Sequence, residues 1–226
     1  MRTQDRRTRQ RLGPQARTDA ILAAATAAFT GDPYSEVSVG AVATAAGASE
    51  ALVYRYFENK AGLYTAVVRD QLERLAAGQR AAVTALPPNT GARDHVRVTI
   101  EAVLESVKDL HVAWASPFFT GADEPAAVQD LRAHYRSELV AELTGQLRNP
   151  DYRRAQLAIA GFLGFLGAAA SEWVEDGCPA DDRGPLVDAA LGALEGALGD
   201  WGSLRPPGPA TMTTSSDGAG SAAGAG

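Results

Sequence analysis

The chain is 226 residues long, carries a net charge of −6, contains one cysteine and is 46% hydrophobic. This length allows one large domain or two modest ones, the negative charge argues against a general polyanion binder, and the single cysteine excludes an internal disulfide. Helix-forming and small residues dominate and no run reads as a series of strands, so the sequence predicts an all-α fold.

The N-terminal third is basic although the chain as a whole is acidic. Residues 1–69 carry nine basic and six acidic side chains, a net charge of +3, whereas residues 70–226 carry twelve and twenty-one, a net charge of −9. Five arginines fall between Arg2 and Arg11, so residues 1–15 are predicted to form a disordered basic arm. Such an arm could contact DNA phosphates, enter the minor groove or remain a solvated tail. A secretory signal is disfavoured because polar residues interrupt the apolar run that follows.

A helix-turn-helix is predicted after a first helix that ends near Gly31. The next helix, Val39 to Ala46, has its apolar residues on one face, and Ser38 is its expected N-cap. Gly47 can end that helix in the left-handed conformation, and Ser49 can cap the following one. A turn of this length is typical of DNA-binding proteins, although the same corner also occurs in proteins that do not bind DNA.

The second helix of the motif has an outer face that could enter the major groove. Glu50 could accept a hydrogen bond from a cytosine amino group, and Ala51 or Leu52 could contact a thymine methyl group. The tyrosine, arginine and lysine side chains are expected to contact phosphates, which fix the register on DNA. The predicted DNA contacts are Ser38, Val39, Ser49, Glu50, Ala51, Leu52, Tyr54, Arg55, Tyr56 and Lys60.

The run LVYRYFENKAGLY, Leu52 to Tyr64, resembles the end of the recognition helix and the start of the next helix in TetR-family transcriptional repressors. Upstream, VSVGAVATAAGAS resembles that family's second helix and turn, and AILAAATAAF its first helix. Tyr56 departs from the histidine often found there. The resemblance covers about residues 16–68 and implies a cytoplasmic, homodimeric repressor that binds a double-stranded DNA operator. It also implies a DNA-binding domain at 16–68 and an effector and dimerisation domain at 69–201.

Five further helices are predicted in the rest of the chain, with proline, glycine or asparagine at the breaks. Their ranges are about 61–86, 93–115, 128–147, 157–170 and 185–201, and residues 202–226 are predicted to form a disordered tail. The first of them would connect the two domains. The apolar run from Leu157 to Ala170 is shorter than the roughly 20 residues needed to span a bilayer, so a buried helix is predicted and no membrane contact.

The last two helices are predicted to pair with those of a second copy as a four-helix interface. Gly161, Gly164 and Gly167 recur every three residues, and each costs up to about 1 kcal/mol inside a helix, which indicates a packing requirement. The alternative is that these glycines pack only within their own subunit. The predicted interface residues are Gly161, Gly164, Gly167, Leu191, Leu194 and Leu198.

Aromatic residues of the second domain could line a cavity for a small apolar or aromatic effector, although most aromatic residues at helical spacing are simply core. The candidates are Trp114, Phe118, Phe119, Tyr135, Phe162, Phe165 and Trp173. Several acids on the same helices could select a cation or could form solvated faces.

Catalytic motifs are lacking in the sequence, which has no G-x-S-x-G, H-E-x-x-H, P-loop or G-x-G-x-x-G pattern. Its three histidines are far apart and none has a second metal-type ligand four residues on. No catalytic residue, metal site or cofactor is therefore predicted. Two alternatives to an effector-responsive regulator stay open: a regulator that binds DNA without an effector or acts through a protein partner, and an enzyme.

Overall fold

The computed structural model describes residues 13–108, 110, 114, 124–147 and 152–199. Within these residues the structure is all α-helix, as predicted, without a strand. The helices are α1 (Pro14–Gly31), α2 (Val39–Ala45), α3 (Glu50–Phe57), α4 (Lys60–Thr84), α5 (Ala92–Val107), α6 (Ala126–Leu147), α7 (Tyr152–Glu175) and α8 (Ala180–Leu198). Residues 1–12 of the predicted arm and the whole predicted tail, 202–226, lie outside the described residues.

The predicted end of α5 and the predicted start of α8 were wrong. Helix α5 ends at Val107, eight residues before the predicted end, and α8 begins at Ala180 although Pro185 was the predicted start. Pro185 lies inside α8, where it cannot donate to the carbonyl of Asp181 one turn back. Pro185 is the sixth residue of α8, so the helix lacks one backbone hydrogen bond in its second turn.

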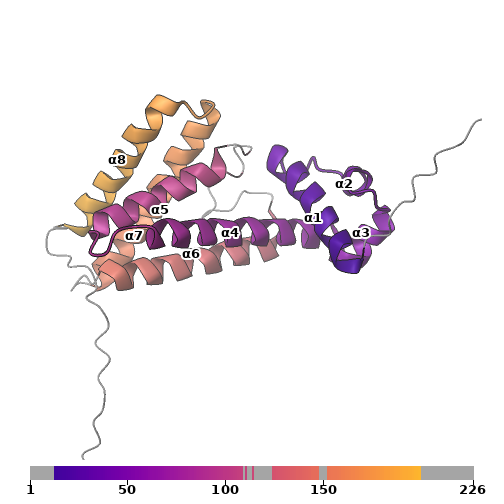
Figure 1. The fold of residues 1–226 in the computed structure, drawn as a ribbon, viewed down its shortest axis with the longest axis horizontal. Helices are drawn as coiled ribbons and strands as arrows, with labels where there is room; N and C mark the ends of the chain where they lie inside the picture. The colour runs from indigo at the N-terminus through magenta and orange to yellow at the C-terminus, as the bar shows by residue number, and fades with distance from the viewer. Residues whose placement is uncertain (1–12, 109, 111–113, 115–123, 148–151, 200–226) are drawn as a thin grey trace, which may run out of the picture.

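The first three helices and the first half of α4 enclose one hydrophobic cluster. Figure 1 shows α1, α2 and α3 gathered at one end of the molecule, with α4 running from them into the other helices. The helices bury the apolar faces that their spacing predicts. Members of this cluster, called the N-terminal core, include Ile21, Phe29, Val42, Val53, Leu63 and Val67, together with Leu72, Trp114 and Val128 from beyond residue 68.

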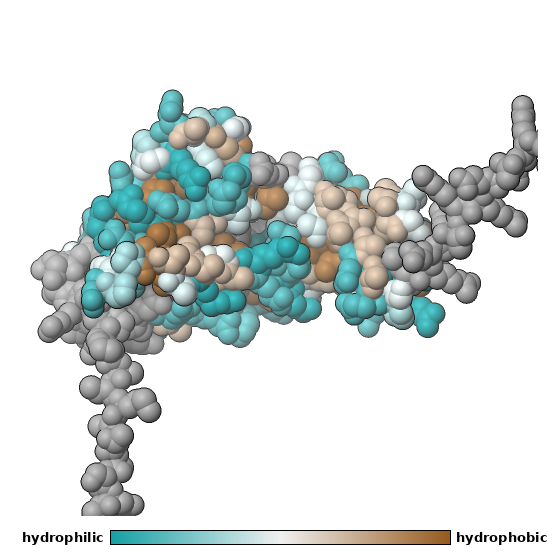
Figure 2. All heavy atoms as spheres, viewed as in Figure 1, coloured by the Kyte–Doolittle hydropathy of each residue, from teal (hydrophilic) through white to brown (hydrophobic). Residues whose placement is uncertain are grey.

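The second half of α4 packs with α5, α6, α7 and α8 around a second cluster. Its buried members include Leu75, Ile100, Leu139, Ile159, Phe162, Leu166, Leu191 and Leu194. On the face seen in Figure 2, hydrophobic residues over this part of the molecule occur in small patches separated by hydrophilic ones. Because α4 supplies Leu63 to the first cluster and Leu75 to the second, the two cores share one continuous helix.

Helix α7 is much longer than the apolar run from which it was predicted. It spans 24 residues, and the stretch Arg153–Glu175, 23 residues long, is apolar and long enough to cross a membrane by length and composition alone. The argument from a short apolar run was therefore wrong. Packing argues for a core helix instead, because Ile159, Phe162 and Leu166 are buried against the other helices of the second cluster.

A buried ion pair lies where the two cores meet. Arg132, on α6, is 1% exposed, and its Nη2 and Nε donate to the two carboxylate oxygens of Glu124 at 2.9 and 3.1 Å. The hydroxyl of Tyr64, on α4, donates to Glu124 Oε1 at 2.6 Å. Burial and this hydrogen bond both raise the pKa of Tyr64, so its hydroxyl keeps the proton that it donates.

Aromatic rings surround this ion pair and extend the contact into the N-terminal core. Tyr64 packs against the rings of Phe29 and Tyr34 at centroid distances of 4.9 and 4.8 Å, and against Trp114 edge to face at 5.7 Å. The Trp114 indole donates to the Phe29 carbonyl at 2.6 Å, and the Arg132 guanidinium lies 5.5 Å from the Trp114 ring centroid. Side chains from α1, α4 and α6 therefore converge on a single cluster, the interdomain cluster.

We predict that Arg132→Met lowers the free energy of unfolding by about 3–5 kcal/mol, because it leaves the Glu124 carboxylate buried without its ion pair. Urea denaturation followed by circular dichroism measures this loss. Arg74→Met is the matched control, since Arg74 pairs with Asp70 at the surface and is expected to cost less than about 1 kcal/mol. An Arg132→Met protein as stable as the control would show that the pair does not hold the domains together.

Candidate functional site

The two helices of the helix-turn-helix begin at the predicted caps. Ser38 Oγ accepts from the Ala41 amide at 3.4 Å at the start of α2, and Ser49 Oγ accepts from the Leu52 amide at 3.3 Å at the start of α3. Between the helices, Gly47 has a φ of +62°, the left-handed conformation that its lack of a Cβ allows. The predicted turn is therefore confirmed, and local side-chain chemistry fixes its geometry.

The junction between α3 and α4 depends on three consecutive features. Glu58 ends α3 with a φ of +63°, and Asn59 Oδ1 then caps α4 by accepting from the Gly62 amide at 2.8 Å. A Cβ at Gly62 would lie inside van der Waals contact of the Phe57 carbonyl oxygen. Glycine is therefore required here so that α4 can pass close to the end of α3.

The outer face of α3 is exposed and carries most of the predicted DNA contacts. Tyr54 and Tyr56 are 39% and 37% exposed, and Ala51 and Arg55 are also exposed. The Glu50 carboxylate, one turn earlier on the helix, raises the pKa of Tyr54. Glu50 is itself exposed at the start of α3, the end of a recognition helix that contacts base edges.

Besides the two capping serines, two other predicted DNA contacts have roles within the structure. The Val39 side chain is only 6% exposed and packs in the N-terminal core, so its inclusion as a side-chain contact was wrong. The Lys60 ammonium group donates to the Ser35 carbonyl at 3.1 Å and lies 4.7 Å from the Tyr34 ring centroid. This lysine thus anchors the loop before α2, and its phosphate contact stays a prediction.

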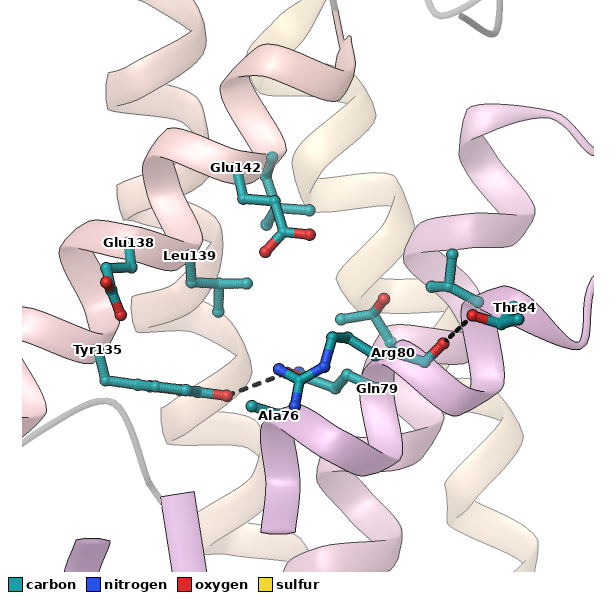
Figure 3. A pocket seen from close by; sticks show the side chains of 11 residues that line it. Ala76, Gln79, Arg80, Thr84, Tyr135, Glu138, Leu139 and Glu142 are labelled. Atoms are coloured by element: carbon teal, nitrogen blue, oxygen red, sulfur yellow. Dashed lines mark hydrogen bonds between the residues drawn. The ribbon is translucent and has the colours of Figure 1, made fainter. Parts of the chain in front are cut away.

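A cavity of about 280 Å³ lies between α4, α5 and α6. The residues that line it are Ala76, Gln79, Arg80, Val83, Thr84, Thr99, Tyr135, Glu138, Leu139, Glu142 and Leu143. In Figure 3, Gln79 and Arg80 extend from α4 toward α6, and Tyr135 and Glu142 extend from α6 toward α4. The cavity is thus amphipathic, with leucine and valine side chains beside amide, hydroxyl and charged groups.

A hydrogen bond between Tyr135 and Gln79 crosses one side of this cavity. The tyrosine hydroxyl donates to Gln79 Oε1 at 3.0 Å, and burial raises the pKa of Tyr135 to about 12, so the hydroxyl stays protonated. Gln79 is 7% exposed, and its Nε2 has no hydrogen-bond partner among the described residues. A buried donor without an acceptor costs about 1–3 kcal/mol.

The predicted pocket aromatics are dispersed in the structure. Tyr135 lines the cavity, whereas Phe162 and Trp173 are buried in the second core and Trp114 belongs to the interdomain cluster. Phe165 is 40% exposed on the surface of α7. Phe118 and Phe119 lie outside the described residues. Apart from Tyr135, the described candidates therefore do not line this cavity, and the polar lining that includes Gln79 was not predicted.

The residues predicted for a dimer interface differ in their exposure. Leu191, Leu194 and Leu198 are buried within the single chain and belong to its own core. Gly161 is exposed, Gly164 half-buried and Gly167 buried. Because three residues fall short of a 3.6-residue turn, the row of glycines runs obliquely around α7, from exposed Gly161 to buried Gly167. The interface itself stays a prediction.

Comparison with known proteins places the N-terminal domain in a family. Residues 21–67 match the sequence profile of the bacterial regulatory proteins, tetR family. Over 197 residues, the chain is 24% identical to the HTH-type transcriptional activator FasR of Mycolicibacterium smegmatis, which covers 86% of this chain and 85% of that protein. The matched segment contains the whole helix-turn-helix.

Solved structures extend the similarity to the whole fold. A TetR-like transcriptional regulator from Rhodococcus sp. RHA1 superposes with a TM-score of 0.65 at 22% identity, over 84% of this chain and all of that one. The transcriptional regulator FadR from Bacillus subtilis, solved in complex with stearoyl-CoA, superposes with a TM-score of 0.60 at 16% identity, over 80% of this chain and 98% of that one. Both relatives are named as regulators, and neither name describes an enzyme.

We predict that Gly62→Ala destabilises the protein by about 1–3 kcal/mol, because the new methyl group overlaps with the Phe57 carbonyl and the helix must shift. Gly78→Ala on the same helix meets nothing within 4 Å and is expected to stabilise by up to about 1 kcal/mol. Thermal unfolding of both variants gives the comparison. Equal effects of the two alanines would contradict the close approach of α3 and α4.

Proposed function

Because the chain is a TetR-family transcriptional regulator with that family's DNA-binding domain at its N-terminus, we propose that it represses transcription in the cytoplasm as a homodimer bound to an operator. A small-molecule effector in the second domain would release it. The exposed outer face of α3 carries this proposal, since its capped helix offers the carboxylate of Glu50, the Tyr54 hydroxyl and the Arg55 guanidinium on one surface. Such a surface fits the major groove and the phosphates beside it.

Dimerisation is proposed through the exposed faces of α7 and α8. The residues on that face of α7 are Leu157, Gly161, Phe165 and Ala168, and those on α8 are Pro185, Ala189, Gly192 and Gly196. A Cβ at Gly161, Gly192 or Gly196 would meet nothing within 4 Å in this chain, so packing inside the subunit does not require these glycines. The close approach of a helix from a second copy would explain these glycines. The exposed Leu157 and Phe165 would supply apolar area to the same interface.

An effector site is proposed in the cavity between α4, α5 and α6. The FadR structure contains stearoyl-CoA, a ligand with a long apolar part, which supports ligand binding by a domain of this fold. In this chain Tyr135 lines the cavity and Arg132 of the interdomain cluster precedes it by three residues, on the same face of α6. A ligand that moves α6 would thereby disturb the contact that orients the DNA-binding domain.

Activation of transcription is the second candidate, because FasR, which is similar over most of the chain, is named as an activator. Repression and activation would use the same DNA-binding and effector sites and would differ in where the operator lies relative to the promoter. Transcription in vitro from a promoter that contains the operator distinguishes them. Less transcript with added protein supports repression, and more transcript supports activation.

We predict that Arg55→Ala weakens binding to every DNA sequence and makes the slope of log K against log salt shallower by about 1.8, because each of the two subunits loses one phosphate contact. Glu50→Ala is expected to relax base preference instead, since a carboxylate at the helix start discriminates between bases by about 1–3 kcal/mol. Fluorescence anisotropy at several salt concentrations measures both effects.

Arg74→Ala is the control for these variants, because it removes the same charge from an exposed site on α4 that is not on the outer face of α3. It is expected to leave the salt slope unchanged. If Arg55→Ala behaved like Arg74→Ala, and Glu50→Ala kept the base preference, α3 would not be the element that enters the groove.

We predict that Gly161→Leu converts the protein to a monomer and lowers operator affinity by about 100-fold or more, because one half-site replaces two linked ones. The leucine causes no clash within the chain, since a Cβ at this position meets nothing within 4 Å. Sedimentation velocity gives the oligomeric state. Gly78→Leu, at an equally open glycine of α4, controls for the added side chain and should stay dimeric. A dimeric Gly161→Leu protein would place the interface elsewhere.

A further inference from the structure

Tyr135 separates the cavity from a second hollow between α4 and α6. This hollow has a volume of about 260 Å³ and is lined by Arg69, Leu72, Glu73, Ala76, Leu131, His134, Tyr135 and Glu138. Ala76, Tyr135 and Glu138 line both spaces. Each space alone is smaller than the roughly 300–1,000 Å³ of small-molecule sites, whereas the two together fall within that range. The Tyr135 side chain is thus the partition in what would otherwise be one long site.

The partition is held by the hydrogen bond from Tyr135 to Gln79, and that bond leaves the amide incompletely satisfied. Gln79 Oε1 accepts from the tyrosine, while Nε2 is buried and has no partner among the described residues. If the oxygen and nitrogen of the Gln79 amide exchanged places, the oxygen would lack a hydrogen-bond partner instead of the nitrogen. Buried amides are nearly always satisfied at both ends, so the free N–H marks a position where an acceptor is missing.

Three exposed charged residues line the first cavity. Arg80 lies on α4, and Glu138 and Glu142 lie one turn apart on α6, which gives this rim a net charge of −1. A ligand with an anionic group would meet more negative than positive charge there. A cationic group would leave the N–H of Gln79 without an acceptor. The apolar walls formed by Val83, Leu139 and Leu143 favour a hydrocarbon body.

We infer that the effector is an uncharged, elongated molecule with a carbonyl-type oxygen that accepts from Gln79 Nε2, and that Tyr135 rotates to admit its chain into the second hollow. This inference rests on the proposed effector site and names the chemistry that the site selects. Gln79 is the specificity-determining residue, and Tyr135 is the gate. The movement of Tyr135 would begin the shift of α6 on which Arg132 lies.

Four probes of related length test this chemistry: 2-heptanone, 2-nonanone, octanoate and octylamine. Isothermal titration of the full-length protein should show that 2-nonanone binds more tightly than octanoate and octylamine. Two additional methylene groups that enter the second hollow should make 2-nonanone bind about tenfold more tightly than 2-heptanone. Failure of both ketones to bind, or tighter binding of either charged probe, would overturn the inference.

Variants separate recognition from packing. Gln79→Leu keeps the volume and removes the donor, so 2-nonanone should bind at least about tenfold more weakly. The double variant Gln79→Leu with Tyr135→Phe also removes the hydroxyl that donates to Gln79, and it should show the same loss. Thr84→Val is the matched control, because the Thr84 hydroxyl already donates to the Arg80 carbonyl, and the affinity should stay within about twofold. Unchanged affinity in both glutamine variants would exclude Gln79 as the recognition group.

Tyr135→Phe tests the gate, since it breaks the bond to Gln79 and keeps the ring. The variant should bind 2-nonanone at least as tightly as the unaltered protein, and weaker binding would contradict the gating role. Operator binding separates this inference from the proposed function. Ketone binding that depends on Gln79 but leaves DNA affinity unchanged would support the site and not the regulation. Operator release by other compounds in a Gln79→Leu protein would support the regulation and overturn the inference.

Discussion

The two-pronged ion pair between Arg132 and Glu124, completed by the Tyr64 hydroxyl, fixes how the DNA-binding domain sits against the rest of the chain. The attraction between two buried charges offsets their desolvation cost only when their geometry is good. A small rotation of α6 would separate the charges, and their burial would keep water from solvating them. Such a contact is either closed or broken. The surrounding rings of Phe29 and Trp114 add packing that also favours one arrangement. This all-or-none character suits an element that transmits a signal between two sites.

The helix-turn-helix could be predicted because residues close together in the sequence determine its geometry. Ser38 and Ser49 cap the helices they precede, and Gly47 adopts the left-handed conformation where its position in the sequence requires it. The all-α fold and most helix ranges follow from apolar spacing in the same way. Val39 was misassigned as a DNA contact, because its place on the apolar face of α2 decides its burial.

The cavity could not be predicted, since its walls come from three helices whose relative rotation the sequence does not specify. Aromatic residues indicated a pocket, but large rings also bury much apolar area in a core, and Phe162 and Trp173 are core residues. Gln79 was overlooked because an isolated glutamine on a long helix is usually solvated. The leucines of α8 share an apolar period that fits a subunit core as well as an interface, and burial within one chain distinguishes the two.

The length of α4 determines what kind of movement can reach the DNA. From Tyr64 to Gln79 the helix covers about 15 residues, or roughly 22 Å, whereas only about 4 residues, or roughly 6 Å, separate Tyr64 from its first residue, Lys60. If α4 turns about the interdomain cluster as a rigid lever, its long arm is on the cavity side. A displacement of about 2 Å at Gln79 would then tilt the helix by about 5° and move Lys60 by only about half an ångström. An effector would therefore act on DNA binding mainly by changing the direction of each recognition helix, and much less by changing its position.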